Sequence, residues 1–84
     1  MMKAIFYLPR ARKALLRHRG QADRIISKIA AYAKNPAAQA NNVKRLKGNI
    51  PVLRLRVGSY RVLFTEDDKR VTVIDIGPRA SIYE

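Results

Sequence analysis

The stretch VLRLRVGSYRVLF, residues 52–64, decides the fold expected of this chain. Side chains alternate between apolar and other types on both sides of Gly58 and Ser59, and this period of two is typical of β-strands. A glycine in first place favours a two-residue hairpin turn in which that glycine has a positive φ. We therefore predict two antiparallel strands, residues 52–57 and 60–66, joined by a tight turn.

Three arginines of this hairpin are expected to project from one face of the sheet. With the turn centred between residues 58 and 59, Arg56 lies directly opposite Arg61, and Arg54 follows on the same face. Like charges directly opposite each other are unfavourable, whereas a bound phosphate relieves their repulsion and suits the planar guanidinium group. The alternative is a basic face that only meets water. The apolar side chains that alternate with these arginines form the face that helices should cover, namely Leu53, Leu55, Val57, Tyr60, Val62 and Phe64.

The whole chain predicts one α+β domain, residues 1–84, in the order β-α-α-β-β-β. Two segments carry apolar residues at helical spacing, and the second ends before Pro36, because the residue before a proline is disfavoured in a helix. The basic segment KRLKGN (44–49) is interpreted as a loop. We expect an antiparallel sheet with the N-terminal helical hairpin packed on one face. The elements expected outside the central hairpin are a strand at 3–8, helices at 10–18 and 21–35, and a strand at 70–76.

The charge of the chain is strongly one-sided. Eighteen lysines and arginines stand against six acidic residues, for a formal net charge of +12. Before Glu66 the only acid is Asp23, and it faces fifteen basic residues between Lys3 and Arg61. Such a field favours a polyanionic partner, with nucleic acid as the first candidate and an acidic protein as the second. Solubility alone requires far less charge.

Several classes of site are not expected from this composition. There is no cysteine, one histidine (His18), and most acids lie together in the EDD turn at 66–68, so no set of metal ligands is expected. Glycine-rich nucleotide-binding motifs are also lacking, and no cofactor is predicted. No segment reads as a signal peptide or a membrane span, which favours a cytoplasmic protein with no membrane partner.

Three segments together resemble the RelE/ParE superfamily of bacterial toxins: RLKG (45–48), LRLRVGSYRVLF (53–64) and VTVIDIGPRASIY (71–83). The resemblance covers nearly the whole chain. It implies the toxin of a type II toxin–antitoxin pair that an acidic antitoxin holds inactive. RelE-like members enter the ribosomal A site and cut mRNA without a metal ion. The 2′-hydroxyl attacks the adjacent phosphate and leaves a cyclic phosphate and a free 5′-hydroxyl.

The resemblance also implies roles for individual residues. Arg61 matches the arginine that stabilises the charge of the phosphorane, and Arg79 matches the one that protonates or stabilises the leaving oxygen. Tyr83 matches the tyrosine that stacks on the substrate base. The catalytic set expected from the resemblance is Arg54, Arg61, Arg79 and Tyr83. The set expected to bind RNA or phosphate is Lys44, Arg45, Lys47 and Arg56.

One departure from the family pattern concerns the general base. The best-known RelE pattern has lysines at the positions held here by Val52 and Arg54, and arginine stays protonated. Lys44 or Lys47 can reach in from the preceding loop, or the arginines can act by electrostatics alone. This departure keeps two alternatives open, namely a ParE-like inhibitor of DNA gyrase and a non-catalytic module that binds RNA or the ribosome.

Overall fold

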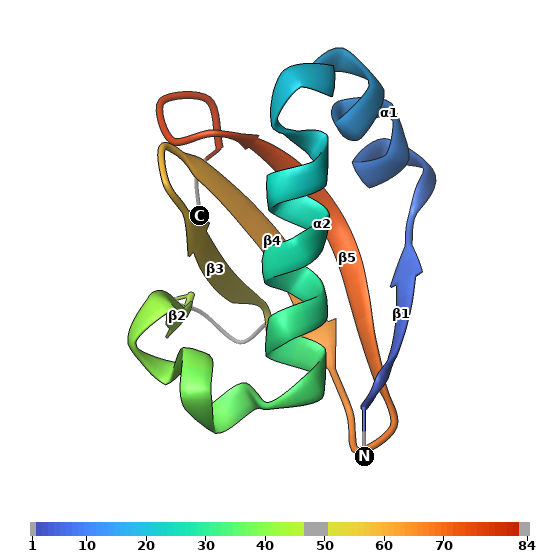
Figure 1. Ribbon diagram of the computed structural model, residues 1–84, viewed down its shortest axis with the longest axis vertical. Helices are drawn as coiled ribbons and strands as arrows, with labels where there is room; N and C mark the ends of the chain where they lie inside the picture. Colours follow the sequence, from blue (N-terminus) through green and yellow to red (C-terminus); the bar gives the residue numbers. More distant parts are fainter. Residues whose placement is uncertain (1, 47–50, 83–84) are drawn as a thin grey trace.

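The computed structural model of the chain describes residues 2–46 and 51–82. It confirms the α+β class and the expected order of elements, and it adds a short helix and a short strand in the middle of the chain (Figure 1). The elements are β1 (Ala4–Tyr7), α1 (Pro9–Arg17), α2 (Arg19–Lys34), the 3₁₀ helix η1 (Pro36–Asn42), β2 (Val43–Arg45), β3 (Leu53–Val57), β4 (Tyr60–Glu66) and β5 (Arg70–Pro78).

The strands form one five-stranded sheet in the order β1-β5-β4-β3-β2. Strands β3, β4 and β5 pair antiparallel as expected, and the additional strand β2 also pairs antiparallel with β3. Strand β1 pairs parallel with β5, so the sheet is mixed rather than wholly antiparallel. The direction of β1 is not set by a tight turn, because two helices follow it before the chain returns to the sheet. Strand β5 lies inside the sheet, in agreement with its apolar residues on both faces.

The central hairpin has the predicted register. Arg56 pairs with Arg61, and Val57 pairs with Tyr60 next to the turn. Gly58 has φ 59°, and no other described residue has a positive φ, which matches a hairpin turn with glycine in first place. The three arginines of the hairpin therefore share one face, as the sequence predicted.

Strand β2 and helix η1 lie where the sequence predicted only a connection and a basic loop. Strand β2 is three residues long and pairs with β3, so that Lys44 lies opposite Arg54. A short, charged strand at the edge of a sheet is common, since it discourages pairing with other chains. It is also too short to show the alternation by which strands are recognised.

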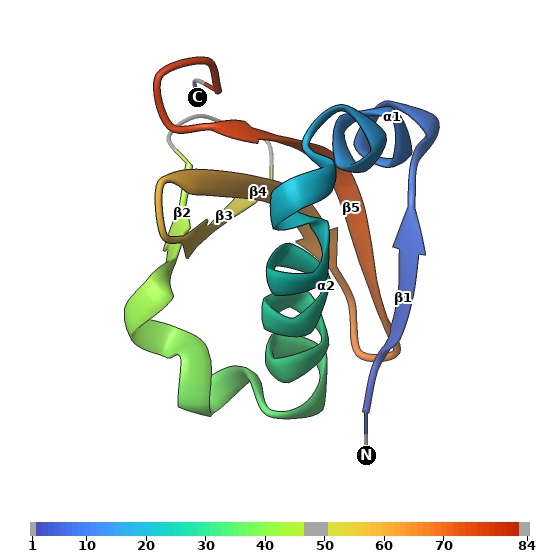
Figure 2. The same cartoon turned by 45° about the horizontal axis from the view of Figure 1, so that its top comes forward.

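Helices cover one face of the sheet, and the core lies between them and the strands (Figure 2). Helix α2 packs its apolar stripe on the sheet, and Tyr32 meets Phe64 edge-on with ring centroids 5.0 Å apart. The buried core consists of Ala11, Ala14, Ile25, Ile29, Tyr32, Ala33, Leu55, Val57, Val62, Phe64, Val71, Val73 and Ile76. Burial of each large apolar side chain contributes about 1.5–3 kcal/mol, so this layer holds the opposite face in place.

The helices in the described part of the chain lack the combination of length and hydropathy that crossing a membrane requires.

Candidate active site

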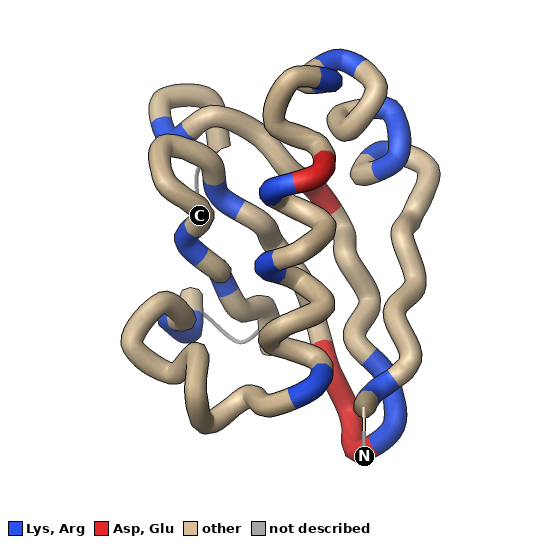
Figure 3. Tube along the Cα trace, viewed as in Figure 1, with Lys and Arg blue, Asp and Glu red and all other residues tan. Residues whose placement is uncertain are grey.

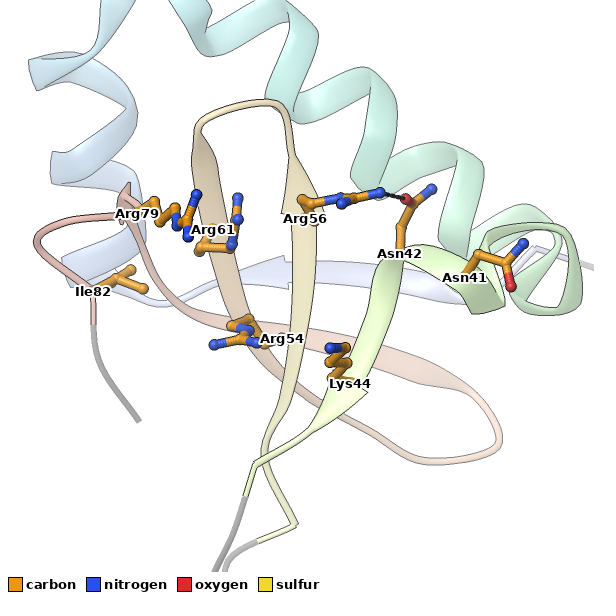
Figure 4. Close-up of a pocket in the computed structure, with 8 residues that line it drawn as sticks. All are labelled: Asn41, Asn42, Lys44, Arg54, Arg56, Arg61, Arg79 and Ile82. Carbon is orange, nitrogen blue, oxygen red and sulfur yellow. Dashed lines mark hydrogen bonds between the residues drawn. The ribbon is translucent and has the colours of Figure 1, made fainter.

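The face of the sheet opposite the helices carries a pocket of about 360 Å³, here called the arginine pocket (Figure 4). It gathers residues from η1, three strands and the turn after β5. Of the eight described residues that line it, five are basic and none is acidic. The lining residues are Asn41, Asn42, Lys44, Arg54, Arg56, Arg61, Arg79 and Ile82.

Strand register brings the basic side chains together. Arg54 and Arg56 are two residues apart on β3 and therefore share a face. Arg61 of β4 lies opposite Arg56, and Lys44 of β2 lies opposite Arg54. The two apolar neighbours of this cluster on β3, Leu55 and Val57, are buried on the other face. The burial of the apolar face thus fixes where the cations point.

The guanidinium group of Arg61 is held by the hairpin turn. Its Nη1 donates to the carbonyl oxygens of Gly58 and Tyr60, at 2.9 Å each. Burial lowers the pKa of Arg61, and the nearby charges of Arg79, Arg54 and Arg56 lower it further. An arginine nevertheless stays protonated at neutral pH. The pocket thus contains a fixed cation in a setting that disfavours positive charge.

Arg56 points away from Arg61 although the two residues are directly paired (Figure 4). Its Nη2 donates to Oδ1 of Asn42 at 3.2 Å, and Nδ2 of Asn42 donates in turn to Oε1 of Gln39 at 3.3 Å. This chain of amides on η1 holds the Arg56 side chain on the far side of the pocket. It eases the repulsion that the register would otherwise impose.

Arg79 reaches the pocket from the turn that follows β5. Its backbone N–H donates to the carbonyl oxygen of Ser59 at 2.7 Å, which ties this turn to the tip of the central hairpin. The N–H of Ile82 donates to the carbonyl of Pro78 at 3.1 Å, and the Ile82 side chain is buried against Gly77. Arg79 therefore lies beside Arg61 on a backbone that is anchored on both sides (Figure 4).

The arginine pocket contains most of the residues that the sequence singled out. Arg54, Arg56, Arg61, Arg79 and Lys44 all line it. Arg45 does not, because it lies opposite Leu53 and so projects toward the helical side of the sheet. The two further candidates, Tyr83 and Lys47, lie outside the described residues.

Sequence reasoning missed three residues of the pocket, namely Asn41, Asn42 and Ile82. The two asparagines lie in η1, which was not predicted, and no pattern in the sequence relates them to the hairpin. Ile82 follows the last strand, and its burial depends on the turn at Pro78–Ser81.

The described acidic residues lie in other parts of the chain, namely in α2, at the end of β4 and in the turn after it, and in β5 (Figure 3). Glu66 pairs with Lys3 at 3.5 Å, and it also accepts a hydrogen bond from the Tyr32 hydroxyl. Asp75, which the sequence left unplaced, pairs with Arg10 of α1 at 3.1 Å. The described residues contain no group of three or more His, Cys, Asp or Glu side chains that could hold a metal ion. None of the described residues that line the arginine pocket is acidic, so the pocket is suited to an anionic ligand.

Comparisons with known proteins agree with this fold. The family model described as "ParE toxin of type II toxin-antitoxin system, parDE" matches residues 5–83. No curated protein matches the sequence.

Solved structures of low sequence identity share the architecture. A chain of the archaeal RelE–RelB complex from Pyrococcus horikoshii OT3 is 22% identical, with a TM-score of 0.76 over 98% of this chain and 100% of that chain. A chain of the E. coli DinJ–YafQ toxin–antitoxin complex is 14% identical, with a TM-score of 0.76 over 100% of both chains. The YoeB dimer from Staphylococcus aureus is 17% identical, with a TM-score of 0.65 over 89% of this chain and 94% of that chain. At these identities the likeness concerns the fold.

Proposed function

The chain belongs to the RelE/ParE superfamily of type II toxin–antitoxin toxins, and we propose that it is a ribosome-dependent endonuclease that cuts mRNA in the A site and so inhibits translation. It acts in the cytoplasm as a single toxin domain, residues 1–84, without a metal ion or cofactor. Its partners are the ribosome with mRNA and an acidic antitoxin. The observation that carries this proposal is the arginine pocket, in which the fixed guanidinium of Arg61 lies beside Arg79 with no acid among the lining residues.

The proposed reaction needs charge stabilisation at two places. The 2′-hydroxyl oxygen loses its proton to a base and forms a bond to phosphorus while the bond from phosphorus to the 5′-oxygen breaks. The leaving 5′-oxygen takes up a proton from water, and the products are a 2′,3′-cyclic phosphate and a 5′-hydroxyl. Negative charge builds on the non-bridging oxygens, where Arg61 donates, and on the leaving oxygen, where Arg79 donates. Hydrogen-bond donors that are already oriented toward the developing charge stabilise the transition state more than mobile donors do, because they do not reorganise during the reaction. The two carbonyl contacts of Arg61 supply this orientation.

The proton of the 2′-hydroxyl requires an acceptor, and Lys44 is the lysine that lines the pocket. It lies opposite Arg54, a position at which the RelE pattern has a lysine. Lysine can lose its proton and act as a base, whereas arginine cannot. We assign the role of general base to Lys44, that of substrate positioning to Arg54 and Arg56, and that of base stacking to Tyr83.

A second candidate function is inhibition of DNA gyrase. The matching family model is described as a ParE toxin, and the described residues that line the pocket include neither a carboxylate nor a histidine. Inhibition of gyrase would require only that the arginines bind phosphate, without any catalysis.

Two assays on the purified protein separate these functions. We expect mRNA in a translation reaction to be cut at codons in the A site, as mapped by primer extension, and we expect supercoiling by gyrase to be unaffected. Inhibited supercoiling with intact mRNA would favour the gyrase function, and no effect in either assay would favour a non-catalytic module. Expression of the chain alone should arrest growth, and co-expression of an acidic antitoxin should restore it.

A further inference from the structure

A second basic hollow, here called the α1 hollow, lies between α1 and the C-terminal end of β5. It measures about 390 Å³. Arg10, Lys13 and Arg17 line it from α1, and Ser81 lines it from the turn after β5. Positions i, i+3 and i+7 fall on one side of a helix, so the three cations form a row along the hollow. The pocket chemistry described above does not use any of them.

The α1 hollow has a surplus of positive charge. Arg10 is paired with Asp75 at 3.1 Å, and Asp75 is the one acid among the described residues of the lining. Lys13 and Arg17 are exposed, and neither has an ion-pair partner among residues 2–46 and 51–82. Two cations thus remain available to an external anion, with the Ser81 hydroxyl as a further donor.

The two basic sites share one wall. The segment at 77–82 contributes Arg79 and Ile82 to the arginine pocket, and it contributes Gly77, Pro78 and Ser81 to the α1 hollow. Figures 1 and 2 show α1 beside the end of β5, where this segment begins. A nucleic-acid strand bound in the arginine pocket can therefore reach α1 by passing over the segment at 77–82.

The lining favours a nucleic acid over a protein. A protein segment that docks through apolar contacts needs exposed apolar side chains, and the helices carry two of these in Leu16 and Ile26, which are 67% and 42% exposed. Neither of them lines the α1 hollow. The hollow instead presents cations and a hydroxyl, the groups that contact phosphate oxygens in nucleic-acid complexes.

We propose that the α1 hollow binds phosphates of the same RNA strand whose scissile phosphate lies in the arginine pocket, through Lys13 and Arg17. The ligand class is the phosphodiester backbone of single-stranded RNA. This inference rests on the proposed function, since it takes the pocket as the site of the scissile phosphate. It adds a second point of attachment that gives the strand a direction across the protein.

The test uses 2′-O-methyl oligonucleotides, which the proposed reaction cannot cut, and measures binding by fluorescence anisotropy. A trinucleotide can fill one site only. A decanucleotide spans roughly 34 Å at about 3.4 Å per nucleotide, and the longest dimension of the protein is 30 Å. The test variant is Lys13→Ala/Arg17→Ala. The matched control is Lys28→Ala/Lys34→Ala, which removes the same charge from α2 away from both sites.

We expect the test variant to bind the decanucleotide on the order of tenfold more weakly at low salt, with the slope of log K against log salt reduced by about 1.4 for two lost phosphates on a single strand. Trinucleotide binding should match that of the control variant. An equal loss for both lengths, or a loss no larger than that of the control, would overturn the inference. So would intact decanucleotide binding combined with weaker binding of an acidic antitoxin, which would make the hollow a protein interface.

A separate variant tests the proposed function on its own. If Arg61→Ala leaves trinucleotide binding unchanged, the arginine pocket is not the phosphate site and the proposed function fails. The inference that both sites hold one strand then fails with it, and the decanucleotide comparison shows separately whether the α1 hollow binds RNA by itself.

Discussion

Arg61→Ala should abolish most of the activity while it leaves the fold intact. The side chain lies on the face opposite the core, so its truncation opens no cavity between the sheet and the helices. What the variant loses is a fixed positive charge next to Arg79 and the two hydrogen bonds that orient it. Removal of one oriented donor for developing negative charge costs on the order of a hundredfold to a thousandfold in rate, or about 3–4 kcal/mol.

The effect on stability should be much smaller. Two hydrogen bonds from a partly exposed guanidinium to backbone carbonyls are together worth about 1 kcal/mol. The variant also relieves the repulsion with the directly opposed Arg56, and such a pair contributes about 0.2–1 kcal/mol. The two effects oppose each other, so the free energy of unfolding should change by less than about 1 kcal/mol. For a domain of this size the melting temperature should then stay within roughly 8 °C of wild type.

Primer extension on translated mRNA and thermal unfolding of the same preparations measure both quantities. Lys28→Ala is the control, because it removes one positive charge from α2 outside the pocket. Arg61→Lys should recover little activity, since a lysine cannot donate as a planar fork. The reasoning is refuted if Arg61→Ala cuts mRNA at the wild-type rate. It is also refuted if the variant melts far below the control, because Arg61 would then be a structural residue.

The remaining predictions concern other groups around the sheet. Lys44→Arg should lose activity as fully as Lys44→Ala if Lys44 is the general base, whereas activity retained in the arginine variant would show that only its charge matters. Arg54→Lys should keep or raise the wild-type cleavage rate, because lysine can also accept a proton, whereas Arg54→Ala should lower it. A lysine variant slower than wild type would contradict this. Asn42→Ala should raise KM while kcat stays similar, because the substitution removes the hydrogen bond that positions Arg56. An unchanged KM would count against this positioning role of Asn42. The backbone N–H groups of residues 69 and 70 lower the pKa of Asp67, so its carboxylate stabilises the fold above its unfolded pKa and ceases to do so as the pH falls through the lower folded pKa. Asp67→Ala should thus lower the melting temperature at pH 7 but not near pH 2, relative to Asp68→Ala, and an equal loss at both pH values would refute this.

The central hairpin was predictable because its signals are local. Gly58 marks the turn, and the alternation on either side sets both the register and the buried face. The helices were predictable for the same reason, since their apolar residues recur at fixed short spacings. Among the predicted strands, β1 differed in its direction, because no local residue determines how a strand pairs with another that lies about 65 residues later.

The site was less predictable than the fold, since much of it depends on long-range packing. The arginines of the hairpin follow directly from the register. Asn42 reaches the pocket only because η1 and β2 fold back onto β3, and neither element has a clear sequence signal. Arg45 illustrates the converse: it belongs to the same basic run as Lys44, but a strand sends neighbouring side chains to opposite faces. Basic composition alone could not distinguish the two.

The charge of the arginine pocket makes the stability of the protein depend on the anion that binds there. The ion pairs among the described residues all lie outside the pocket. They join Glu66 to Lys3, Asp75 to Arg10 and Asp67 to Arg70. The cations of the pocket are therefore kept together by the apolar core beneath them, against their own repulsion. A ligand that binds only the folded protein adds to its stability in proportion to the logarithm of its concentration over its Kd. RNA and an acidic antitoxin tail would both gain from neutralising the same cations, so they compete for one site on electrostatic grounds. Under the proposed function, an acidic antitoxin segment that occupied the pocket would inhibit the toxin without changing its shape, because none of the described lining residues is acidic.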